Sequence, residues 1–284
     1  MNNNNNINYK IRRFASGSLI NLFLLLVTLS CLFPLLWMFG SSLKTQATVF
    51  SDMSLIPRVL HWENYYRAWT EGNFGVYFLN SVIYTVSVVV GIVLVSSLAA
   101  YAFSRLQFPG RNFFFYMFLA AMMIPLPGSF VPLYVLMEKL HLRNTPHGYV
   151  LCLINVGLSL SIFLLKTFFD KMPKDLEDAA RIDGCSKLGI WWNVALPLAR
   201  PALAVIIIFN SLNVWNEYIL ALILFDDARF MPLQVGLATF HGEFVTQYHL
   251  LMAGVTITVI PILLIYIFMQ KHIVKGLSAG AVVG

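Results

Sequence analysis

The chain has 284 residues, of which 58% are hydrophobic and only 11% carry a charge, whereas about a quarter of the residues in a soluble domain are charged. Six long stretches contain a single charged residue between them, Glu217. They are residues 14–43, 72–104, 112–137, 144–165, 201–225 and 244–270. A soluble domain would have too few polar residues to cover them, and their continuous apolar character lacks the alternation of barrel strands. The composition therefore predicts an all-α membrane protein.

Each stretch is long enough to cross a bilayer core of about 30 Å, which takes roughly 20 apolar residues in a helix. We expect six transmembrane helices, near residues 18–40, 76–103, 113–136, 148–169, 201–225 and 250–270. Residues 14–284 are then one membrane domain, and the Asn-rich, basic residues 1–13 are expected to be disordered. The start resembles a signal peptide, but its apolar run is too long and no small-residue cleavage site follows.

The basic residues predict how the chain lies in the membrane. Six crossings place both termini on one side, and that side carries 13 of the 19 Lys and Arg residues, within 10–13, 105–111, 166–200 and 271–275. By the positive-inside rule, both termini and the 166–200 segment are cytoplasmic in a multi-pass protein of the cell membrane. The net charge of +6 therefore reflects topology, and we expect no nucleic-acid partner.

Sequence patterns for catalysis and metal binding are absent. Cys31, Cys152 and Cys185 have no CxxC spacing, which gives neither a disulfide framework nor a metal site. The sequence has no Gly-Lys pair for a phosphate-binding loop and no His-Glu pair for a zinc protease. A GxSxG run at 276–280 follows a helix, not the strand that a nucleophile elbow needs. We therefore expect a chain that is not an enzyme and holds no cofactor or metal.

Aromatic residues gather in the segment after the first expected span. They are Trp62, Tyr65, Tyr66 and Trp69. Aromatic side chains anchor helices at the membrane boundary, so the segment fits an interfacial helix, with docking of an external partner as the alternative.

Proline and glycine are concentrated in the third expected span. The residues are Pro125, Pro127, Gly128 and Pro132. A proline removes a backbone donor and crowds the preceding turn, so this helix must kink or break. A break within the membrane is tolerated where protein or water satisfies the freed backbone. Both a bent structural helix and a gate beside a transport pathway fit this pattern.

Polar residues form a stripe on the fifth expected span. Asn210, Asn213 and Glu217 fall within about 60° of one another on a helix that turns 100° per residue. Such groups are costly in hydrocarbon and normally face a bundle interior or a wet cavity. The stripe therefore fits a translocation path or a polar contact between subunits, and equally a hydrogen-bonded clamp between helices.

The cytoplasmic segment 170–200 has the pattern of a helical hairpin. Acidic residues including Asp175 suit the first turn of a helix. Gly184 can end that helix, and Ser186 can cap a second one that runs to Pro197. The pattern fits a plain amphipathic surface hairpin, or a helix that docks into a groove of another protein.

This hairpin resembles the EAA loop of binding-protein-dependent ABC importer permeases. The family pattern E-A-A-x-x-D-G, followed by L-P, is matched by Asp178 to Gly184 and by Leu196-Pro197. Asp178 stands where the motif has glutamate, and we expect the neighbouring Glu177 to compensate. Other segments resemble the sugar-permease branch of the family. They are Asn80-Ser81, Pro132-Leu133-Tyr134, Trp215-Asn216-Glu217 and residues 275–281.

The resemblance implies a six-span permease subunit of a maltose-type carbohydrate importer, which moves a sugar, oligosaccharide or related polyol into the cytoplasm by alternating access. It implies a heterodimer with a second permease subunit, two ATP-binding cassette subunits that bind ATP and Mg²⁺, and an extracytoplasmic solute-binding protein. The residues implied to couple the chain to the ATPase subunits are Glu177, Asp178, Ala179, Ala180, Asp183 and Gly184.

An ion-coupled secondary transporter is the alternative. That class typically has intramembrane charges or broken helices in both of its repeated halves. This sequence has one such charge, Glu217, and one Pro-rich span.

Overall fold

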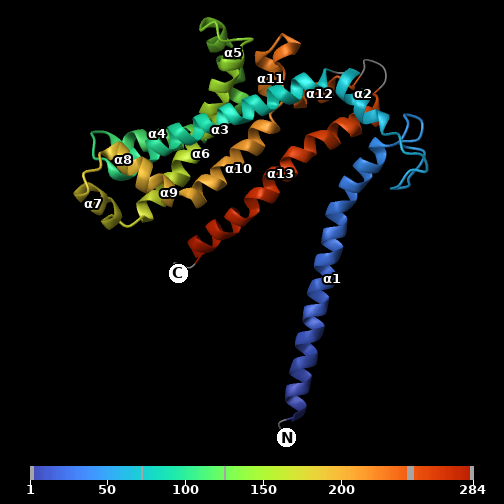
Figure 1. The fold of residues 1–284 in the computed structure, drawn as a ribbon, viewed down its shortest axis with the longest axis horizontal. Coiled ribbons are helices and arrows are strands. Elements are labelled where there is room, and N and C mark those ends of the chain that lie inside the picture. Colours follow the sequence, from blue (N-terminus) through green and yellow to red (C-terminus); the bar gives the residue numbers. More distant parts are fainter. Residues whose placement is uncertain (1–2, 72, 125, 242–245, 282–284) are drawn as a thin grey trace. The chain divides into compact units, whose positions relative to one another are not determined.

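The computed structural model (Figure 1) describes residues 3–71, 73–124, 126–241 and 246–281, with side chains described outside 3–16, 126–127 and 269–281. Within these ranges every regular element is a helix, and the β-pairing is limited to an isolated bridge between His241 and Thr246. This confirms the all-α class. The chain divides into two compact units, Met1–Glu71 with Phe240–Ile257 and Gly72–Thr239 with Thr258–Gly284.

Four helices of the described chain are long and apolar enough to cross a membrane. They are α1 (Asn3–Ser42) through its part Gly17–Ser42, α3 (Phe74–Arg105), α6 (Pro146–Lys171), and α13 (Tyr248–Ala281) through its part Tyr248–Phe268. A fifth span results if the bent pair Lys187–Leu198 and Arg200–Trp215, which meets at 78°, counts as one. The structure thus supports a multi-pass membrane protein, with interruptions in the third and fifth expected spans.

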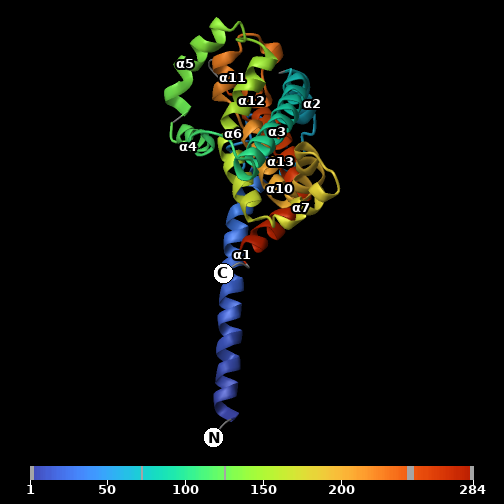
Figure 2. The same ribbon diagram turned by 90° about the vertical axis from the view of Figure 1, so that its left-hand side faces the viewer.

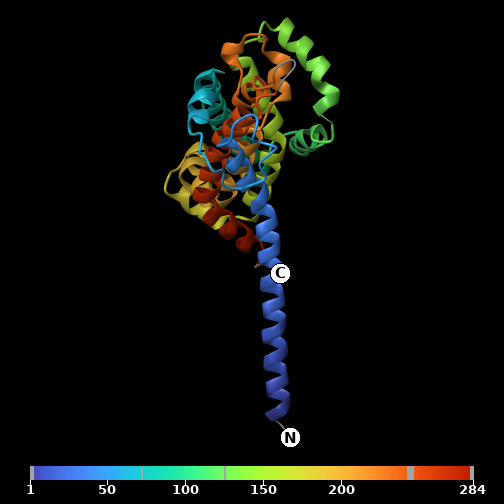
Figure 3. The ribbon, with the colours of Figure 1, turned by 90° about the vertical axis from the view of Figure 1, so that its right-hand side faces the viewer.

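The third expected span breaks at its Pro-rich part, as predicted. It consists of α4 (Arg111–Ala121) and α5 (Leu126–Lys139). Between them, the N–H groups of residues 122–124 each bond the carbonyl three residues earlier, which is the tighter pattern of a helix end. Figures 2 and 3, seen from opposite sides, both show α4 and α5 running in different directions.

The fifth expected span is also two helices, which the sequence did not predict. α10 (Arg200–Trp215) ends before Asn216, and α11 (Ile219–Leu224) begins three residues later. The carboxylate of Glu217 accepts hydrogen bonds from the N–H groups of Leu220 and Ala221, at 2.6 and 3.1 Å. These are donors that a new helix leaves without a partner, so Glu217 supports the restart.

Close packing of α3 on α6 forms the centre of the second unit. A Cβ at Gly91 would collide with Ile154 Cδ1, and a Cβ at Gly157 would collide with Ile92 Cδ1. Glycine at these two positions therefore allows the helices to approach each other. The buried core continues through α10 and through the rings of Tyr84, Tyr149 and Phe225.

The first unit is held together around the end of α1. The buried Lys44 ammonium donates to the carbonyls of Asp52 and Ser54, at 2.5 and 2.8 Å, which closes the loop after α1. Asn64, in α2 (Glu63–Glu71), donates to the carbonyls of Ser42 and Lys44, both at 2.8 Å. The expected aromatic segment is thus a short helix that is tied to α1.

The N-terminal segment for which the sequence predicts disorder is included in the bounds of α1. α1 begins at Asn3 and runs without interruption into the apolar span. Because adding a residue to an existing helix is easier than nucleating one, a polar segment can continue the helix of an adjoining span.

Candidate functional site

A cavity of about 500 Å³ lies among α6, α10 and the residues that follow α4. Its lining residues from α10 and the restart after it include Asn210, Asn213 and Glu217, so the structure brings the whole predicted polar stripe to one cavity. Asn155 and Ser159 add polar groups from α6. Apolar walls with a few convergent polar groups are typical of ligand pockets, which measure roughly 300–1,000 Å³.

The three stripe residues have different surroundings. Asn210 is buried, and its Nδ2 donates to Ser161 Oγ at 3.1 Å and to the Ile206 carbonyl at 2.9 Å. Asn213 is exposed and lines the cavity. Asn210 therefore joins α10 to α6, while the exposed side chain of Asn213 is accessible from the cavity.

Glu217 combines a clamp with a place in the cavity lining. Its Oε2 accepts a 2.8 Å hydrogen bond from Tyr149 Oη on α6, and both carboxylate oxygens also accept from N–H groups of α11. The same side chain is half-buried and lines the cavity. The two readings of Glu217 left open by the sequence, pathway and clamp, are therefore compatible in one residue.

Asn155 and Ser159 were not among the residues predicted for the site. They lie four residues apart on α6, so they share one face of that helix. Two polar residues at this spacing on an apolar span are the same kind of signal as the stripe on α10, and they could have been found by it.

The predicted gate residues that the structure describes belong to α5, the second helix of the broken third span. Pro125 lies outside the described residues; Pro127 belongs to α5, but its side chain is not described. Gly128 and Pro132 are exposed on α5, and a Cβ at Gly128 would meet nothing within 4 Å. The break itself borders the cavity, because Ala121, Met122 and Ile124 line it.

A helical hairpin lies between α6 and α10, as predicted. α7 (Asp175–Ile182) ends before Gly184, whose φ of +81° is the left-handed conformation that glycine tolerates best. Ser186 caps α8 (Lys187–Ile190) by accepting a 3.1 Å hydrogen bond from Gly189 N. The turn therefore uses both cap residues that the sequence indicated.

The sequence predicts that the second helix of the hairpin ends at Pro197. In the structure it continues by one residue, to Leu198. A π-helical segment, η1 (Trp191–Ala195), joins α8 to α9 (Leu196–Leu198). Proline lacks an N–H and crowds the carbonyl four residues earlier in a regular helix. A wider π turn just before it changes that alignment, and the bend follows at Ala199.

The two faces of α7 have different surroundings. Glu177 and Ala180 face inward and are buried, whereas Asp178, Ala179 and Asp183 are exposed. Ile182 is 87% exposed, an unusual position for a large apolar side chain. The predicted coupling residues therefore lie on two opposite faces, and only the outer face is free to meet another protein.

Glu177, which was expected to compensate for the shorter Asp178, is buried and does not share the exposed face of Asp178. Its Oε1 accepts a 2.6 Å bond from Arg105 Nε, and both side chains are buried, at 3% and 6% exposure. Asp178 pairs with Arg181 at 2.9 Å on the exposed face. Arg105 has a role in placing α7 that sequence reasoning did not indicate, because the two partners are 72 residues apart.

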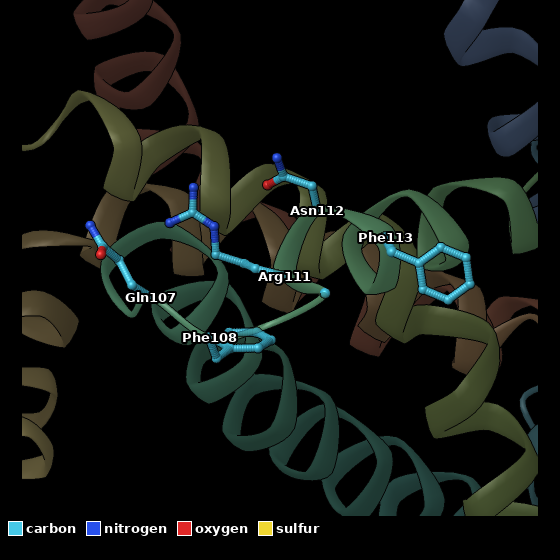
Figure 4. Close-up of a pocket in the computed structure, with 6 residues that line it drawn as sticks. Gln107, Phe108, Arg111, Asn112 and Phe113 are labelled. Atoms are coloured by element: carbon cyan, nitrogen blue, oxygen red, sulfur yellow. The ribbon is translucent and has the colours of Figure 1, made fainter.

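A more open depression of about 390 Å³ lies at the turn between α3 and α4. Figure 4 shows the polar ends of Gln107, Arg111 and Asn112 around this turn, with the ring of Phe113 directed away from them. Arg111 Nη1 donates to the Leu106 carbonyl at 3.3 Å, which stabilises the turn. The depression lies at the basic turn after α3, and its lining residues are different from those of the cavity.

Charged residues join the turn after α5 to the segment after α11. Arg143 pairs with Asp226 and with Glu138, and these hydrogen bonds raise the pKa of Arg143 above its ordinary value. Nearby, hydrogen bonds from Arg229 lower the pKa of Asp227. Arg143 and Asp227 therefore keep their charges near neutral pH, and these ion pairs fix the loop at this end of α6 and α11.

A metal site is not evident in the part of the chain that the structure describes. No group of three or more His, Cys, Asp or Glu side chains is placed there to hold an ion.

Membrane helices around a partly polar cavity, with a helical hairpin that leaves one face exposed, fit a membrane transport protein. Comparison with known proteins gives the family. Residues 92–279 match the model described as "Binding-protein-dependent transport system inner membrane component", and the chain belongs to that family. Such a chain is a transport component and not an enzyme, and it works with a partner permease, an ATPase and a solute-binding protein.

Similar proteins span nearly the whole chain. A diacetylchitobiose uptake system permease of Streptomyces coelicolor is 36% identical over 95% of this chain and 89% of its own length. A trehalose/maltose transport system permease of Thermococcus litoralis is 35% identical over 92% and 94%. A solved structure of a bacterial ABC transporter involved in alginate import has a TM-score of 0.79 at 26% identity, over 93% of this chain and 97% of that one.

These comparisons give no support to the ion-coupled alternative. The similar proteins are named as permeases of uptake or transport systems, and the similar structure belongs to an ABC transporter. The chain is therefore assigned to an ATP-driven importer.

Proposed function

We propose that this chain carries a carbohydrate through the membrane, and that the cavity of about 500 Å³ is part of its path. The observation that carries the proposal is the cavity lining. Asn155, Asn213 and Glu217 offer amide and carboxylate groups for sugar hydroxyls, and Phe209 offers an apolar face. The relatives named for diacetylchitobiose and for trehalose or maltose support a sugar, oligosaccharide or related polyol as the substrate.

Six crossings fit the helices if two of the crossings are broken. α4 with α5 forms the third crossing, and α10 with α11 forms the fifth. Irregular backbone in a membrane is tolerated where it lies against protein or lines a water-filled cavity, and both breaks contribute residues to the cavity, Met122 and Glu217 among them. Both termini and the 170–200 hairpin are then cytoplasmic within a membrane domain of residues 14–284, in agreement with the distribution of basic residues.

The hairpin is the contact for the ATPase subunits in this proposal. The exposed face of α7 has the small and acidic residues of the EAA pattern, Ala179 and Asp178 among them. A short amphipathic helix of this kind can seat in a groove of a partner. ATP and Mg²⁺ are bound by two cassette subunits, a second permease subunit completes the path as a heterodimer, and a solute-binding protein delivers the sugar from outside.

Alternating access follows from two arrangements of the broken spans. Closure of the ATPase subunits moves α7, and the break after α4 opens or closes the cavity to one side of the membrane. Each state must have its own contacts for this to occur. The gate candidates Pro125, Pro127, Gly128 and Pro132 would then belong to the element that changes.

Ligand-dependent ATP hydrolysis by the complete complex tests this proposal. The permeases, ATPase and binding protein are reconstituted in proteoliposomes, and hydrolysis is measured over a panel of mono- and oligosaccharides. We expect stimulation by one class of saccharide and uptake of that saccharide. The proposal fails if no saccharide stimulates hydrolysis or is taken up while another class of solute does both.

A further inference from the structure

A buried ion pair fixes α7 to the end of α3. Arg105 is the last residue of α3, and its Nε donates to Glu177 Oε1 at 2.6 Å. Its Nη2 also donates to the Met172 carbonyl at 2.7 Å. A buried charge that loses its partner is strongly destabilising. Separation of α7 from the end of α3 would break this pair and therefore costs free energy.

A second contact links the same end of α3 to α6. Ser104 Oγ donates to Asp170 Oδ1 at 2.7 Å, and Lys166 pairs with the other oxygen of that carboxylate, also at 2.7 Å. Residues of the last turn of α3 therefore bind the end of α6, the segment after it and α7. This end of α3 is the joint to which the hairpin is attached.

Hydrogen bonds also fix the opposite end of α3, to the segment 229–238. Asn80 Nδ2 donates to the carbonyls of Arg229 and Met231, at 2.8 and 3.0 Å. Tyr84 Oη donates to the Phe230 carbonyl at 2.8 Å.

The contacts at this end continue into α12 (Leu233–Ala238). Ser81 Oγ accepts a 2.7 Å bond from Leu233 N, and a Cβ at Gly236 would collide with the ring of Tyr77. Side chains on one face of the first turns of α3 thus hold a segment more than 140 residues further along the chain.

The helix between these two attachments is continuous. α3 has 32 residues without proline, which at 1.5 Å per residue gives a length of about 48 Å. It packs along α6 with glycine at the closest approach, Gly91 and Gly157. A continuous helix that is packed in this way transmits displacement from one end to the other because packed interiors deform little.

We propose that α3 is a rod that links α7 to the segment 229–238, with the pair of Arg105 and Glu177 as its inner joint and Asn80, Ser81 and Tyr84 as its outer joint. This rests on the proposed function, in which α7 meets the ATPase subunits. By the same topology the segment 229–238 lies on the side where the binding protein delivers its sugar. A displacement at either end of α3 then reaches the other end, so that binding-protein docking and ATP hydrolysis are coupled.

The test measures how strongly sugar-loaded binding protein stimulates ATP hydrolysis by the reconstituted complex. Glu177→Gln weakens the inner joint, and Tyr84→Phe removes a hydroxyl from the outer joint. We expect each to lower the stimulation by about fivefold or more, the lower range of measured coupling between sites. The double variant should fall little further, because two changes in one coupled path are not additive.

Matched controls use the same chemical changes at exposed positions. Glu71 is in an exposed pair with Arg67, and Tyr116 is exposed on α4. Glu71→Gln and Tyr116→Phe should keep the stimulation of the wild type. If Glu177→Gln does not assemble, the double change Arg105→Met and Glu177→Met takes its place, because removal of both charges leaves none stranded.

The outcomes separate this inference from the proposed function. A wild-type complex that no saccharide stimulates contradicts the proposed function. A stimulated wild type with unchanged Glu177→Gln and Tyr84→Phe variants overturns the rod alone. Losses that add fully in the double variant also overturn it, because they indicate two independent effects.

Discussion

The phenolic hydroxyl of Tyr149 donates a 2.8 Å hydrogen bond to Glu217 Oε2 and so joins α6 to the break between α10 and α11. The same carboxylate accepts from Leu220 N and Ala221 N. Glu217 is the only charged residue in the six apolar stretches, and these three donors satisfy it beside the cavity. A residue that holds the break together is well placed to respond when the cavity changes shape.

Replacement of Glu217 should separate its clamp role from its charge. Glu217→Gln keeps a carbonyl oxygen that can accept from the α11 N–H groups, whereas Glu217→Ala leaves those donors and the Tyr149 hydroxyl without their partner. We expect Glu217→Ala to destabilise the fold by about 1–3 kcal/mol, the cost of unsatisfied buried groups, and Glu217→Gln to cost less. Thermal unfolding of the purified complex measures both, and equal losses would contradict the clamp.

Substitution of Gly184 should weaken the hairpin through its backbone alone. A Cβ there would meet nothing within 4 Å, but φ is +81°. A β-branched residue is strained in this conformation by about 1–2 kcal/mol, whereas asparagine visits it more readily. Gly184→Val should therefore lower substrate-stimulated ATPase activity of the complex more than Gly184→Asn does. Equal activity of the two variants would show that the turn conformation is not needed.

Alanine at Gly157 should force α3 and α6 apart. The added Cβ would collide with Ile92 Cδ1 and with Asn210 Oδ1, and overpacking of this kind typically costs about 1–3 kcal/mol. Gly17→Ala in α1 is the control, because a Cβ there would meet nothing within 4 Å. We expect a lower unfolding temperature for Gly157→Ala and an unchanged or higher one for the control. Equal stability of the two variants would mean that the helices can separate freely.

Asn144 should contribute through both its backbone and its side chain. Its φ is +54°, its N–H donates to the Leu224 carbonyl at 2.8 Å, and its Oδ1 accepts from Asp226 N and Asp227 N, both at 3.1 Å. Asn144→Gly keeps the conformation and loses the side-chain acceptor, while Asn144→Ala loses both. Alanine should lower the unfolding temperature more than glycine, and the reverse order would rule out a backbone contribution.

Local signals predicted much of this molecule. Long apolar stretches identified four of the spans, and cap residues identified the turn at Gly184 and the helix start at Ser186. These features depend on residues that are close together in the sequence, so the sequence alone is enough to predict them. The break of the third span followed in the same way from its prolines.

Contacts between distant segments were not predictable. Arg105 and Glu177 are 72 residues apart, and nothing in the periodicity of either helix indicates that they meet. For the same reason the sequence did not indicate that Glu177 is buried against the end of α3. The break of the fifth span was missed because residues 201–225 contain no proline or glycine after Pro201 to mark it, and only the structure shows that the Glu217 carboxylate supports a new helix.

Sugar uptake by the reconstituted complex tests the central claim most directly. Proteoliposomes with both permease subunits, the ATPase and the binding protein are loaded with ATP, and entry of a labelled oligosaccharide is measured with and without the ATPase subunits. We predict uptake that requires ATP and the ATPase and does not respond to an imposed ion gradient. Uptake by the permease alone, driven by such a gradient, would contradict this account.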